Sequence, residues 1–304
     1  MKLGINTAIL EHYNFDEMLE FSAKVGFKCV EVACWPKGNS QRRYGGVSHI
    51  DVDNMSEDSV NKIKNLCNKH NIEISALAYY PNPMDEDLQK REAVIKHLLK
   101  VIDAAQKLNV ELVTTFIGRM QNKNIDENIK EFSKIWPKII KYAKDRNIKI
   151  AIENCPMLFT NDEWPGGQNL FTSPAIWKKL FEIVPDDNFG INFDPSHFIW
   201  QQMDYIKPIY DFKDRIFHIH FKDLKIIESL RNEYGILANP LKYMKPKIPG
   251  QGDVNWSKFI SALNDINYNC CACVEIEDKS FENSNERIAE SIVITHRYLK
   301  QFIY

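Results

Sequence analysis

Residues 188–197 read NFGINFDPSH, and this stretch decides how the rest of the chain is interpreted. Its first six residues are largely apolar and predict a buried strand. The strand stops abruptly at Asp194, and Pro195 and His197 follow directly. A carboxylate and an imidazole at the end of an apolar strand are typical of a functional site, because unpaired charges are costly to bury in a core.

Three other short apolar runs in the C-terminal half end in the same way. They close on Glu153, His220 and Glu275, so four successive predicted strands finish in an acid or an imidazole. One carboxylate after a strand is usually an ordinary surface residue, but that explanation fits four strands in a row poorly. We therefore expect Glu153, Asp194, His220 and Glu275 to converge on one metal ion.

The same pattern runs through the whole chain. An amphipathic helix ends in Gly or Asn, residues that suit the left-handed backbone at a helix terminus, and a short apolar run and a polar loop follow. Eight such units occur without a linker or a shift in composition. Alternating strands and helices imply a parallel sheet, and eight units imply an α/β fold, a single (β/α)8 TIM barrel spanning residues 1–304.

An open, doubly wound sheet is the alternative architecture. It would require a glycine-rich phosphate-binding turn after the first strand, but residues 6–10 read NTAIL. In a barrel, by contrast, the active site lies at the C-terminal ends of the strands, where the four predicted ligands fall.

The donor set predicts the kind of metal. Three carboxylates and one imidazole offer mainly hard oxygen ligands, which suit Mn²⁺ best, with Mg²⁺ or Co²⁺ as alternatives, whereas a structural zinc site favours thiolates. Three converging carboxylates would repel one another, and a divalent cation removes that repulsion.

Polar residues beside these strand ends each have two interpretations. His197 either contacts a substrate or orients a metal ligand, unless it only caps a helix. His218 points to the same side of its strand as His220 and either supports the site from a deeper layer or is structural. Asp223 is expected to hydrogen-bond a metal-bound imidazole, unless it forms an ordinary ion pair in its loop.

Aromatic side chains cluster near the ends of other predicted strands. Trp35, Tyr80 and Trp164 offer flat faces for stacking on sugar rings, although aromatic residues of this kind also simply close the top of a barrel. His49, in the loop after the second strand, is a candidate acid or base within the same pocket, and Lys222 is a further candidate contact. The sequence thus predicts a carbohydrate substrate.

Composition excludes several other classes of protein. The formal net charge of −2 provides no basic field for nucleic acid. No signal-peptide pattern opens the chain and no apolar run reaches membrane-spanning length. Seven cysteines, an odd number, predict reduced thiols in a cytoplasmic protein. Residues 224–252 lack clear periodicity and predict a long functional loop or lid.

Five short motifs carry a resemblance to a known family. They are residues 152–154 (IEN), 193–197 (FDPSH), 218–223 (HIHFKD), 249–252 (PGQG) and 274–277 (VEIE). Together they resemble the xylose isomerase-like TIM barrel superfamily, which contains sugar isomerases and epimerases and is related to endonuclease IV. The resemblance covers nearly the whole chain and is specific for the superfamily, but it is weak for the substrate.

The resemblance implies a role for each matching residue. Glu153, Asp194, His220 and Glu275 match the ligands of a Mn²⁺-type ion, and His197 matches a histidine that contacts the substrate. Glu153 and Glu275 would remove and return a proton on opposite faces of a carbon next to a carbonyl. The ion would polarise that carbonyl and stabilise an enediolate.

Two departures from the family pattern narrow the substrate. Epimerases of free ketoses carry an arginine six residues after the position of His220, where this chain has Ile226. This difference disfavours a simple epimerase of tagatose or psicose. Endonuclease IV needs further histidines at strand ends that here read Tyr79-Tyr80-Pro81 and Phe116-Ile117-Gly118, and an Asp-x-His that here reads Gly252-Asp253-Val254. DNA repair is therefore disfavoured.

The HFKD sequence at residues 220–223 looks more like the branch acting on inosose and on 3-keto sugars or 3-keto glycosides. Members of that branch epimerise, dehydrate or eliminate, and some cleave C-glycosides together with a small partner subunit. Family members also often form dimers or tetramers. The resemblance thus implies an isomerase or epimerase, with a lyase of the same fold as the alternative.

Overall fold

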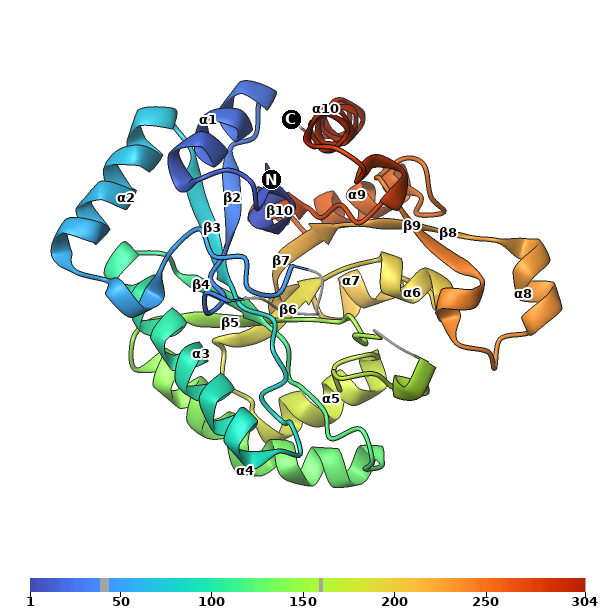
Figure 1. The fold of residues 1–304 in the computed structure, drawn as a ribbon. Helices are drawn as coiled ribbons and strands as arrows, with labels where there is room; N and C mark the ends of the chain where they lie inside the picture. Colours follow the sequence, from blue (N-terminus) through green and yellow to red (C-terminus); the bar gives the residue numbers. More distant parts are fainter. Residues whose placement is uncertain (39–43, 159–160, 304) are drawn as a thin grey trace.

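A computed structural model of the protein describes residues 1–38, 44–158 and 161–303. Eight parallel strands form a closed barrel (Figure 1). They are β1 (Lys2–Asn6), β2 (Cys29–Ala33), β3 (Glu73–Ala78), β4 (Leu112–Thr115), β5 (Lys149–Glu153), β6 (Phe189–Phe193), β7 (Ile216–Phe221) and β10 (Cys271–Val274). Each strand pairs with the next in this order and β10 pairs with β1, so the predicted (β/α)8 barrel is confirmed.

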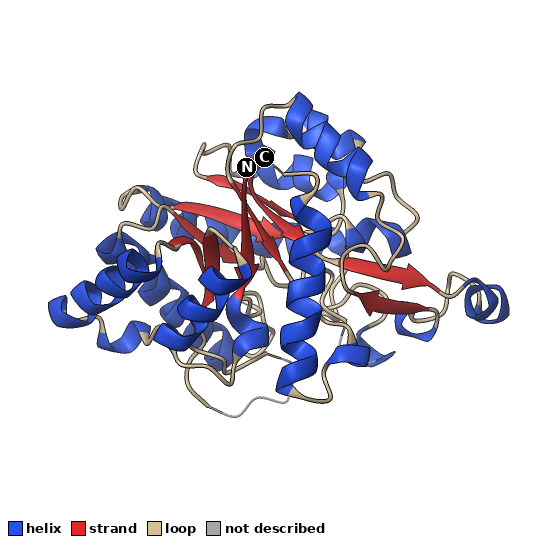
Figure 2. Cartoon of the chain, turned by 90° about the horizontal axis from the view of Figure 1, so that it is seen from above, coloured by secondary structure: helices blue, strands red, loops and turns tan. Residues whose placement is uncertain are grey.

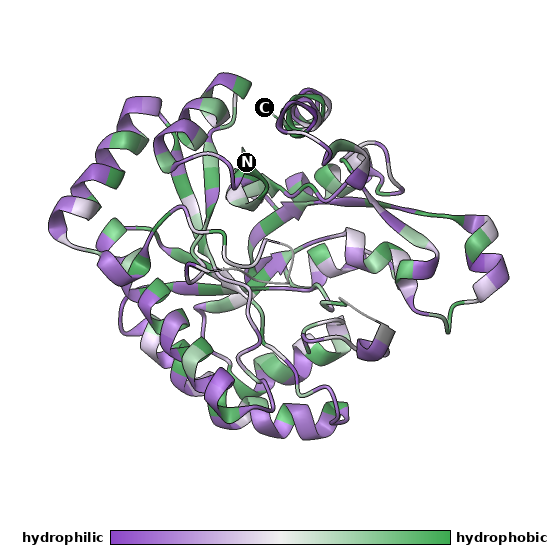
Figure 3. Ribbon diagram, viewed as in Figure 1, coloured by the Kyte–Doolittle hydropathy of each residue, from purple (hydrophilic) through white to green (hydrophobic). Residues whose placement is uncertain are grey.

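Helices surround the barrel on the outside (Figure 2). They are α1 (Phe15–Val25), α2 (Glu57–His70), α3 (Leu88–Leu108), α4 (Ile125–Lys144), α5 (Pro174–Ile183), α6 (Ser196–Trp200), α7 (Lys207–Asp211), α9 (Trp256–Asp265) and α10 (Asn285–Lys300), whereas α8 (Glu228–Tyr234) lies away from the barrel (Figure 1). Short 3-10 helices occupy Thr7–Leu10, Val52–Asn54, Asn161–Glu163, Lys213–Arg215, Pro240–Lys242 and Lys279–Phe281. Hydrophobic and hydrophilic residues alternate along the outer helices, as expected when each buries one face (Figure 3).

Polar caps set the ends of these helices. Asn14 begins α1 and Asn124 begins α4, each in a reciprocal capping box. Helices α2 and α3 end at Asn71 and Asn109, whose φ angles of 53° and 60° are left-handed. The asparagine stops inferred from the sequence are therefore confirmed at both helices, and each one returns the chain to the next strand.

The register of the barrel shifts at two places that matter for the site. The β2–β3 pairing shifts between Val30 and Glu31, and the β6–β7 pairing shifts between Ile191 and Asn192. A bulge re-aims the side chain beside it. Both Glu31 and Asn192 reach the His220 ring inside the barrel.

The segment between β7 and α9 leaves the barrel as an arm. Strands β8 (Asp223–Ile226) and β9 (Met244–Lys247) pair antiparallel, and α8 lies between them at the tip (Figure 1). The predicted long loop thus contains two short strands and a helix. Only a few scattered residues of the arm, such as Leu224, Tyr243 and Ile248, are deeply buried, so the segment shows no simple hydrophobic period. Lid behaviour of residues 224–252 stays a prediction.

All seven cysteines are unpaired, as the free-thiol interpretation predicted. Among the described residues, no helix combines the length and the apolar character needed to cross a membrane.

Candidate metal centre and substrate cavity

The four predicted metal ligands meet at the C-terminal end of the barrel. One ligand atom from each of Glu153, Asp194, His220 and Glu275 lies within 4.8 Å of all the others. Their strands β5, β6, β7 and β10 are consecutive around the barrel. Glu153 is the last residue of β5 and His220 the last but one of β7, whereas Asp194 and Glu275 directly follow β6 and β10, one residue later than predicted.

These four side chains present buried polar atoms that make no hydrogen bond. Glu153 Oε1, Asp194 Oδ2, His220 Nδ1 and Glu275 Oε2 are buried and make no hydrogen bond among the described residues. Buried polar atoms are normally satisfied, so four adjacent exceptions call for an explanation. A divalent cation fits, because it would supply the missing partner for three oxygens and one imidazole nitrogen at once.

The other nitrogen of His220 is held from behind by Glu31. His220 Nε2 donates to Glu31 Oε2 at 2.6 Å. Because a carboxylate only accepts, Nε2 carries a hydrogen, and Nδ1 is the nitrogen that faces Glu153 and Glu275, whose oxygens lie 3.4 and 3.1 Å away. A carboxylate behind a histidine in this way fixes its tautomer and orientation for metal binding.

Glu31 is a functional residue that sequence analysis missed. Besides His220, its carboxylate accepts hydrogen bonds from Tyr80 (2.5 Å), Thr114 (2.6 Å) and Asn6 (3.2 Å). Burial alone would raise the pKa of Glu31, but His220, His218 and Thr114 outweigh it and lower the pKa to about 2. The available signal was an acid inside the apolar run CVEVA at residues 29–33.

Three nearby carboxylates raise the pKa of His220. Burial alone would lower the pKa of its imidazole, but Glu31, Glu153 and Glu275 raise it well above the usual value. A proton on Nδ1 therefore competes with a cation for the same position.

A deeper polar layer supports this arrangement. Asn192 places its amide nitrogen 3.0 Å from His220 Nε2, and its amide oxygen accepts from His218 Nδ1 at 3.1 Å. His218 Nε2 lies 3.3 Å from Ser75 Oγ. His218 thus occupies the layer beneath the centre and reaches it through Asn192.

The prediction that Asp223 hydrogen-bonds a metal-binding imidazole is wrong, because its carboxylate binds other groups. The Asp223 carboxylate accepts from the backbone N–H groups of Leu224, Gly250, Gly252 and Val254 and from the indole of Trp256. Asp223 therefore fixes the PGQG turn by accepting from its backbone N–H groups. These donors could not be inferred from the position of Asp223 in the sequence. A side chain at Gly252 would clash, since its Cβ would lie 2.1 Å from Asp223 Oδ1.

His197 sits at the edge of the centre, in the first turn of α6. Its Nε2 lies 3.1 Å from Asp194 Oδ2 and 3.7 Å from Glu153 Oε1, and the Trp200 indole donates to its Nδ1 at 3.5 Å. Burial alone would lower the pKa of His197, but Cys155 and Asp194 raise it well above the usual value. Its position suits both interpretations offered by the sequence, orienting Asp194 and facing a substrate.

A cavity of about 730 Å³ opens above the centre. Glu153, His197 and Glu275 are among its lining residues. The arm contributes a wall from β9. Of the five predicted substrate contacts, the structure places three in the lining: Trp35, Tyr80 and Lys222.

Two predicted substrate contacts lie elsewhere. The ring nitrogens of His49 lie 3.1 Å from Thr7 Oγ1 and 3.2 Å from the Leu10 carbonyl oxygen. Trp164 donates its indole N–H to the Leu237 carbonyl and packs edge-on against Trp200. Neither is among the described residues that line the cavity, because loop paths, which the sequence does not reveal, turn both rings away.

Lys222 places a buried ammonium beside the centre. Its Nζ lies 3.4 Å from Glu275 Oε2 and 2.7 Å from Glu277 Oε2. Burial alone would lower the pKa of Lys222, but Glu275 and Glu277 raise it well above the usual value, so it stays charged. Burial alone would raise the pKa of both Glu275 and Glu153. Lys222 nevertheless lowers the pKa of Glu275, and His220 lowers that of Glu153. Both glutamates are therefore ionised at neutral pH.

Comparison with known proteins identifies relatives of this architecture. The family described as "xylose isomerase-like TIM barrel" matches residues 19–298. The chain is 26% identical to the uncharacterised protein YfiH of Bacillus subtilis over 303 residues, covering 91% of this chain and 93% of that one. It is 22% identical to an inosose dehydratase of Clostridium tetani over 277 residues, covering 86% of each.

Solved structures share the fold. The protein IolI, solved with a bound zinc atom, superimposes with a TM-score of 0.72 at 19% identity, over 99% of this chain and 96% of that one. The 3-keto-D-glucoside 4-epimerase YcjR of Escherichia coli superimposes with a TM-score of 0.73 at 14% identity, over 99% of both chains. At these identities the likeness shows the fold alone.

Proposed function

The chain belongs to the xylose isomerase-like TIM barrel family, and from that premise we propose that it is a divalent-metal-dependent sugar isomerase or epimerase. It would act on a keto sugar or a 3-keto glycoside by moving a proton on a carbon next to a carbonyl. Mn²⁺ is the proposed metal, because oxygen donors dominate the set. The bound zinc of IolI is a finding about that protein, and it makes Zn²⁺ a second ion to assay here.

One observation carries the proposal. The buried atoms of Glu153, Asp194, His220 and Glu275 that make no hydrogen bond lie together, and Glu153 and Glu275 line a cavity large enough for a sugar. A bound divalent ion would supply Lewis acidity for a substrate carbonyl. Asp194 is fully buried beneath the cavity surface, so we assign it to holding the ion rather than to moving a proton.

Glu153 and Glu275 are suited to proton transfer. They stand at the two ends of the four-strand arc, and both line the cavity, so they approach a substrate from different sides. Both are ionised at neutral pH, which lets one of them accept the proton from carbon. Return of a proton from the other side would invert the carbon, and return to a neighbouring carbon would isomerise the sugar.

The remaining lining would position the substrate. The indole of Trp35 and the ring of Tyr80 provide faces for the apolar side of a sugar, while Lys222 offers a cation for a hydroxyl or carbonyl oxygen. The hydroxyl of Tyr80 is directed to Glu31, so only its ring is available for stacking.

A lyase of the same fold is the second candidate. Two observations favour it: the inosose dehydratase relative, and the buried ammonium of Lys222 beside Glu275. In a dehydratase, removal of the proton would be followed by loss of a neighbouring hydroxyl, which needs an acid to leave as water. Lys222 or His197 is placed to supply that proton.

Solvent-deuterium exchange tests the proposal and separates the two candidates. The protein, loaded separately with Mn²⁺, Co²⁺, Mg²⁺ or Zn²⁺, is incubated in D₂O with a 3-keto-glucoside or an inosose and followed by NMR. An epimerase introduces deuterium at C2 or C4 and leaves the glycosidic bond intact, whereas a lyase releases the aglycone or water. Absence of both exchange and release with every ion and substrate would overturn the proposal.

A further inference from the structure

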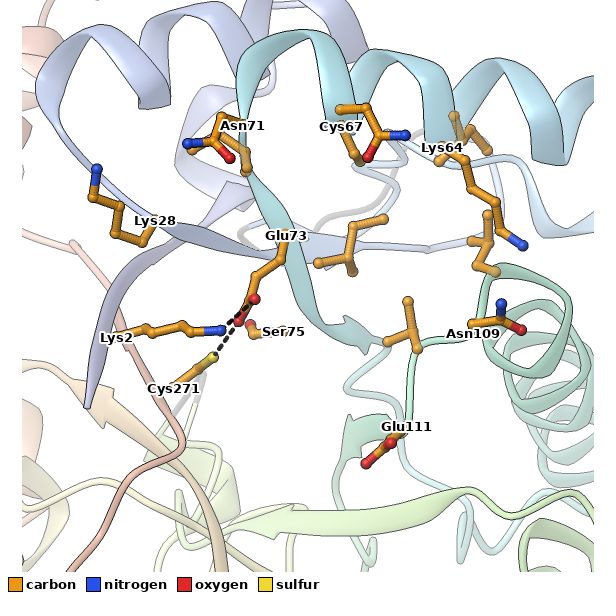
Figure 4. Close-up of a pocket in the computed structure, with 16 residues that line it drawn as sticks. Lys2, Lys28, Lys64, Cys67, Asn71, Glu73, Ser75, Asn109, Glu111 and Cys271 are labelled. Carbon is orange, nitrogen blue, oxygen red and sulfur yellow. Dashed lines mark hydrogen bonds and ion pairs between the residues drawn. The ribbon is translucent and has the colours of Figure 1, made fainter.

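A second cavity lies at the opposite, N-terminal end of the barrel. It has a volume of about 970 Å³ and opens beside β1, β3 and α2. Figure 4 shows Lys2, Glu73 and Cys271 meeting at one of its walls. None of the four predicted metal ligands described above lines it, so it is separate from the candidate centre.

Two thiols and a carboxylate converge beside this cavity. One ligand atom from each of Cys29, Glu73 and Cys271 lies within 4.8 Å of the other two. The Cys271 thiol donates to Glu73 Oε1 at 3.3 Å, whereas Glu73 Oε2 accepts from the Lys2 ammonium at 2.5 Å. Cys29 is fully buried, and Cys271 lines the cavity.

Gly4 leaves room for the Cys29 thiol of this cluster. Its strand β1 lies between β2 and β10, which carry the cysteines. A Cβ at position 4 would lie 2.5 Å from Cys29 Sγ and 2.7 Å from Cys273 Sγ. Because glycine leaves that space empty, sulfur atoms from two strands that are not neighbours approach across β1.

We propose that Cys29, Cys271 and Glu73 form a second metal site, for a thiophilic divalent cation of the Zn²⁺ class. Two thiolates and a carboxylate are donors that Zn²⁺ binds at about 2.0–2.3 Å, so donors now within 4.8 Å of one another need to close only slightly. Water from the cavity completes a tetrahedral set. The site is independent of the proposed catalysis.

Charge and proton balance are both satisfied. On binding, each thiol loses its proton to solvent as a sulfur–metal bond forms, and no electron is transferred. Two thiolates, the carboxylate and the cation together leave one negative charge, which the adjacent Lys2 ammonium offsets. The site would tie β2, β3 and β10 together at the base of the barrel, so metal binding stabilises the fold.

Cobalt titration tests this site with a readout that the upper centre does not share. Co²⁺ bound by thiolates gives an intense near-ultraviolet charge-transfer band, whereas the four ligands predicted for the upper centre contain no sulfur. We expect the tag-free, metal-stripped protein to bind two Co²⁺ per chain and to show this band. Cys271→Ser should lose the band and one Co²⁺. Asp194→Asn should keep the band.

Two cysteine variants serve as matched controls. Cys67 lines the same cavity outside the cluster, and Cys155 lines the upper cavity. Cys67→Ser and Cys155→Ser should both retain the band. The proposal is overturned if the wild-type protein shows no band at saturating Co²⁺, if the band survives Cys271→Ser, or if Cys155→Ser removes it. Because Cys271 is only partly buried, its serine variant is a milder change than one at Cys29.

Discussion

The two ends of the barrel interior carry side chains of different chemistry on the same strands. On β2, Cys29 at the lower end is followed two residues later by Glu31, and on β10, Cys273 is followed by Glu275. Side chains two residues apart on a strand point to the same side, so thiols and carboxylates form successive layers inside the barrel. The upper layer has hard oxygen donors and the lower one has soft sulfur donors, which sorts metals by preference.

The ends also differ in how their polar atoms are satisfied. At the upper end, four ligand atoms are buried without a hydrogen bond, and they are held from below by a fully bonded carboxylate, Glu31. At the lower end, Cys271, Glu73 and Lys2 bond to one another. The upper end thus leaves buried polar atoms that the proposed ion would satisfy, whereas the lower end is already hydrogen-bonded without an ion.

Removing either proton-transfer glutamate should give the largest contrast between the ends. We expect Glu153→Gln or Glu275→Gln to lower kcat by about 10³-fold or more, because each loses both a ligand and a base. The measurement is steady-state turnover of the substrate found by deuterium exchange, at saturating metal. Glu111→Gln, at the lower cavity, is the matched control and should retain wild-type kcat. Substantial turnover in either upper variant would contradict the assignment.

Loss of the carboxylate behind His220 should have a smaller, separable effect. Glu31→Gln is expected to weaken Mn²⁺ binding by about 10–100-fold, because Glu31 orients the ring and makes its other nitrogen a better donor. The measurement is Mn²⁺ titration, with folding checked by circular dichroism. Asp223→Asn is the comparison: it should lower the melting temperature by loosening the PGQG turn and leave Mn²⁺ affinity nearly unchanged. Equal Mn²⁺ affinities for wild type and Glu31→Gln would remove the supporting role.

Variants of the predicted substrate contacts should differ in their kinetic effect according to whether the residue lines the upper cavity. We expect Trp35→Ala to raise KM by about tenfold, the equivalent of one lost stacking contact. Trp164→Phe should leave kcat/KM within about threefold, because the ring lies outside the lining and only its hydrogen bond to Leu237 is lost. Steady-state kinetics on the same substrate compares the two. A larger effect at Trp164 than at Trp35 would show that the arm and its neighbours rearrange when substrate binds.

A change at Gly4 should affect stability alone. Gly4→Ala forces the sulfur atoms of Cys29 and Cys273 apart and is expected to cost about 1–3 kcal/mol of unfolding free energy. Denaturant unfolding of metal-free protein measures this cost, and adding Cys29→Ala should recover part of it. An alanine variant as stable as the wild type would mean that the sulfurs are not held against β1.

Much of the fold and the centre could be predicted from the sequence alone. Alternating helices and apolar runs specify the eight-stranded barrel, because both hydrophobic periods are local properties of the chain. Parallel strands bring their carboxyl ends to one edge, so Glu153, Asp194, His220 and Glu275 could be grouped before their contacts were known. Motif resemblance then supplied their expected roles.

Other features depended on contacts across the barrel. Glu31 reaches His220 from 189 residues away, at a register shift that no local pattern announces. Asp223 looked like a partner of His220 because it is close in sequence, yet it folds back onto the PGQG turn. His49 and Trp164 follow loop paths that turn them out of the cavity.

The sequence by itself determined which elements form and which end of the barrel carries the site. Only the tertiary structure decided which side chains surround that site, and it alone brought Cys29, Glu73 and Cys271 together. The physical reason is that hydrophobic periodicity is written in neighbouring residues, whereas contacts through a barrel interior depend on strand register and bulges summed around the whole sheet.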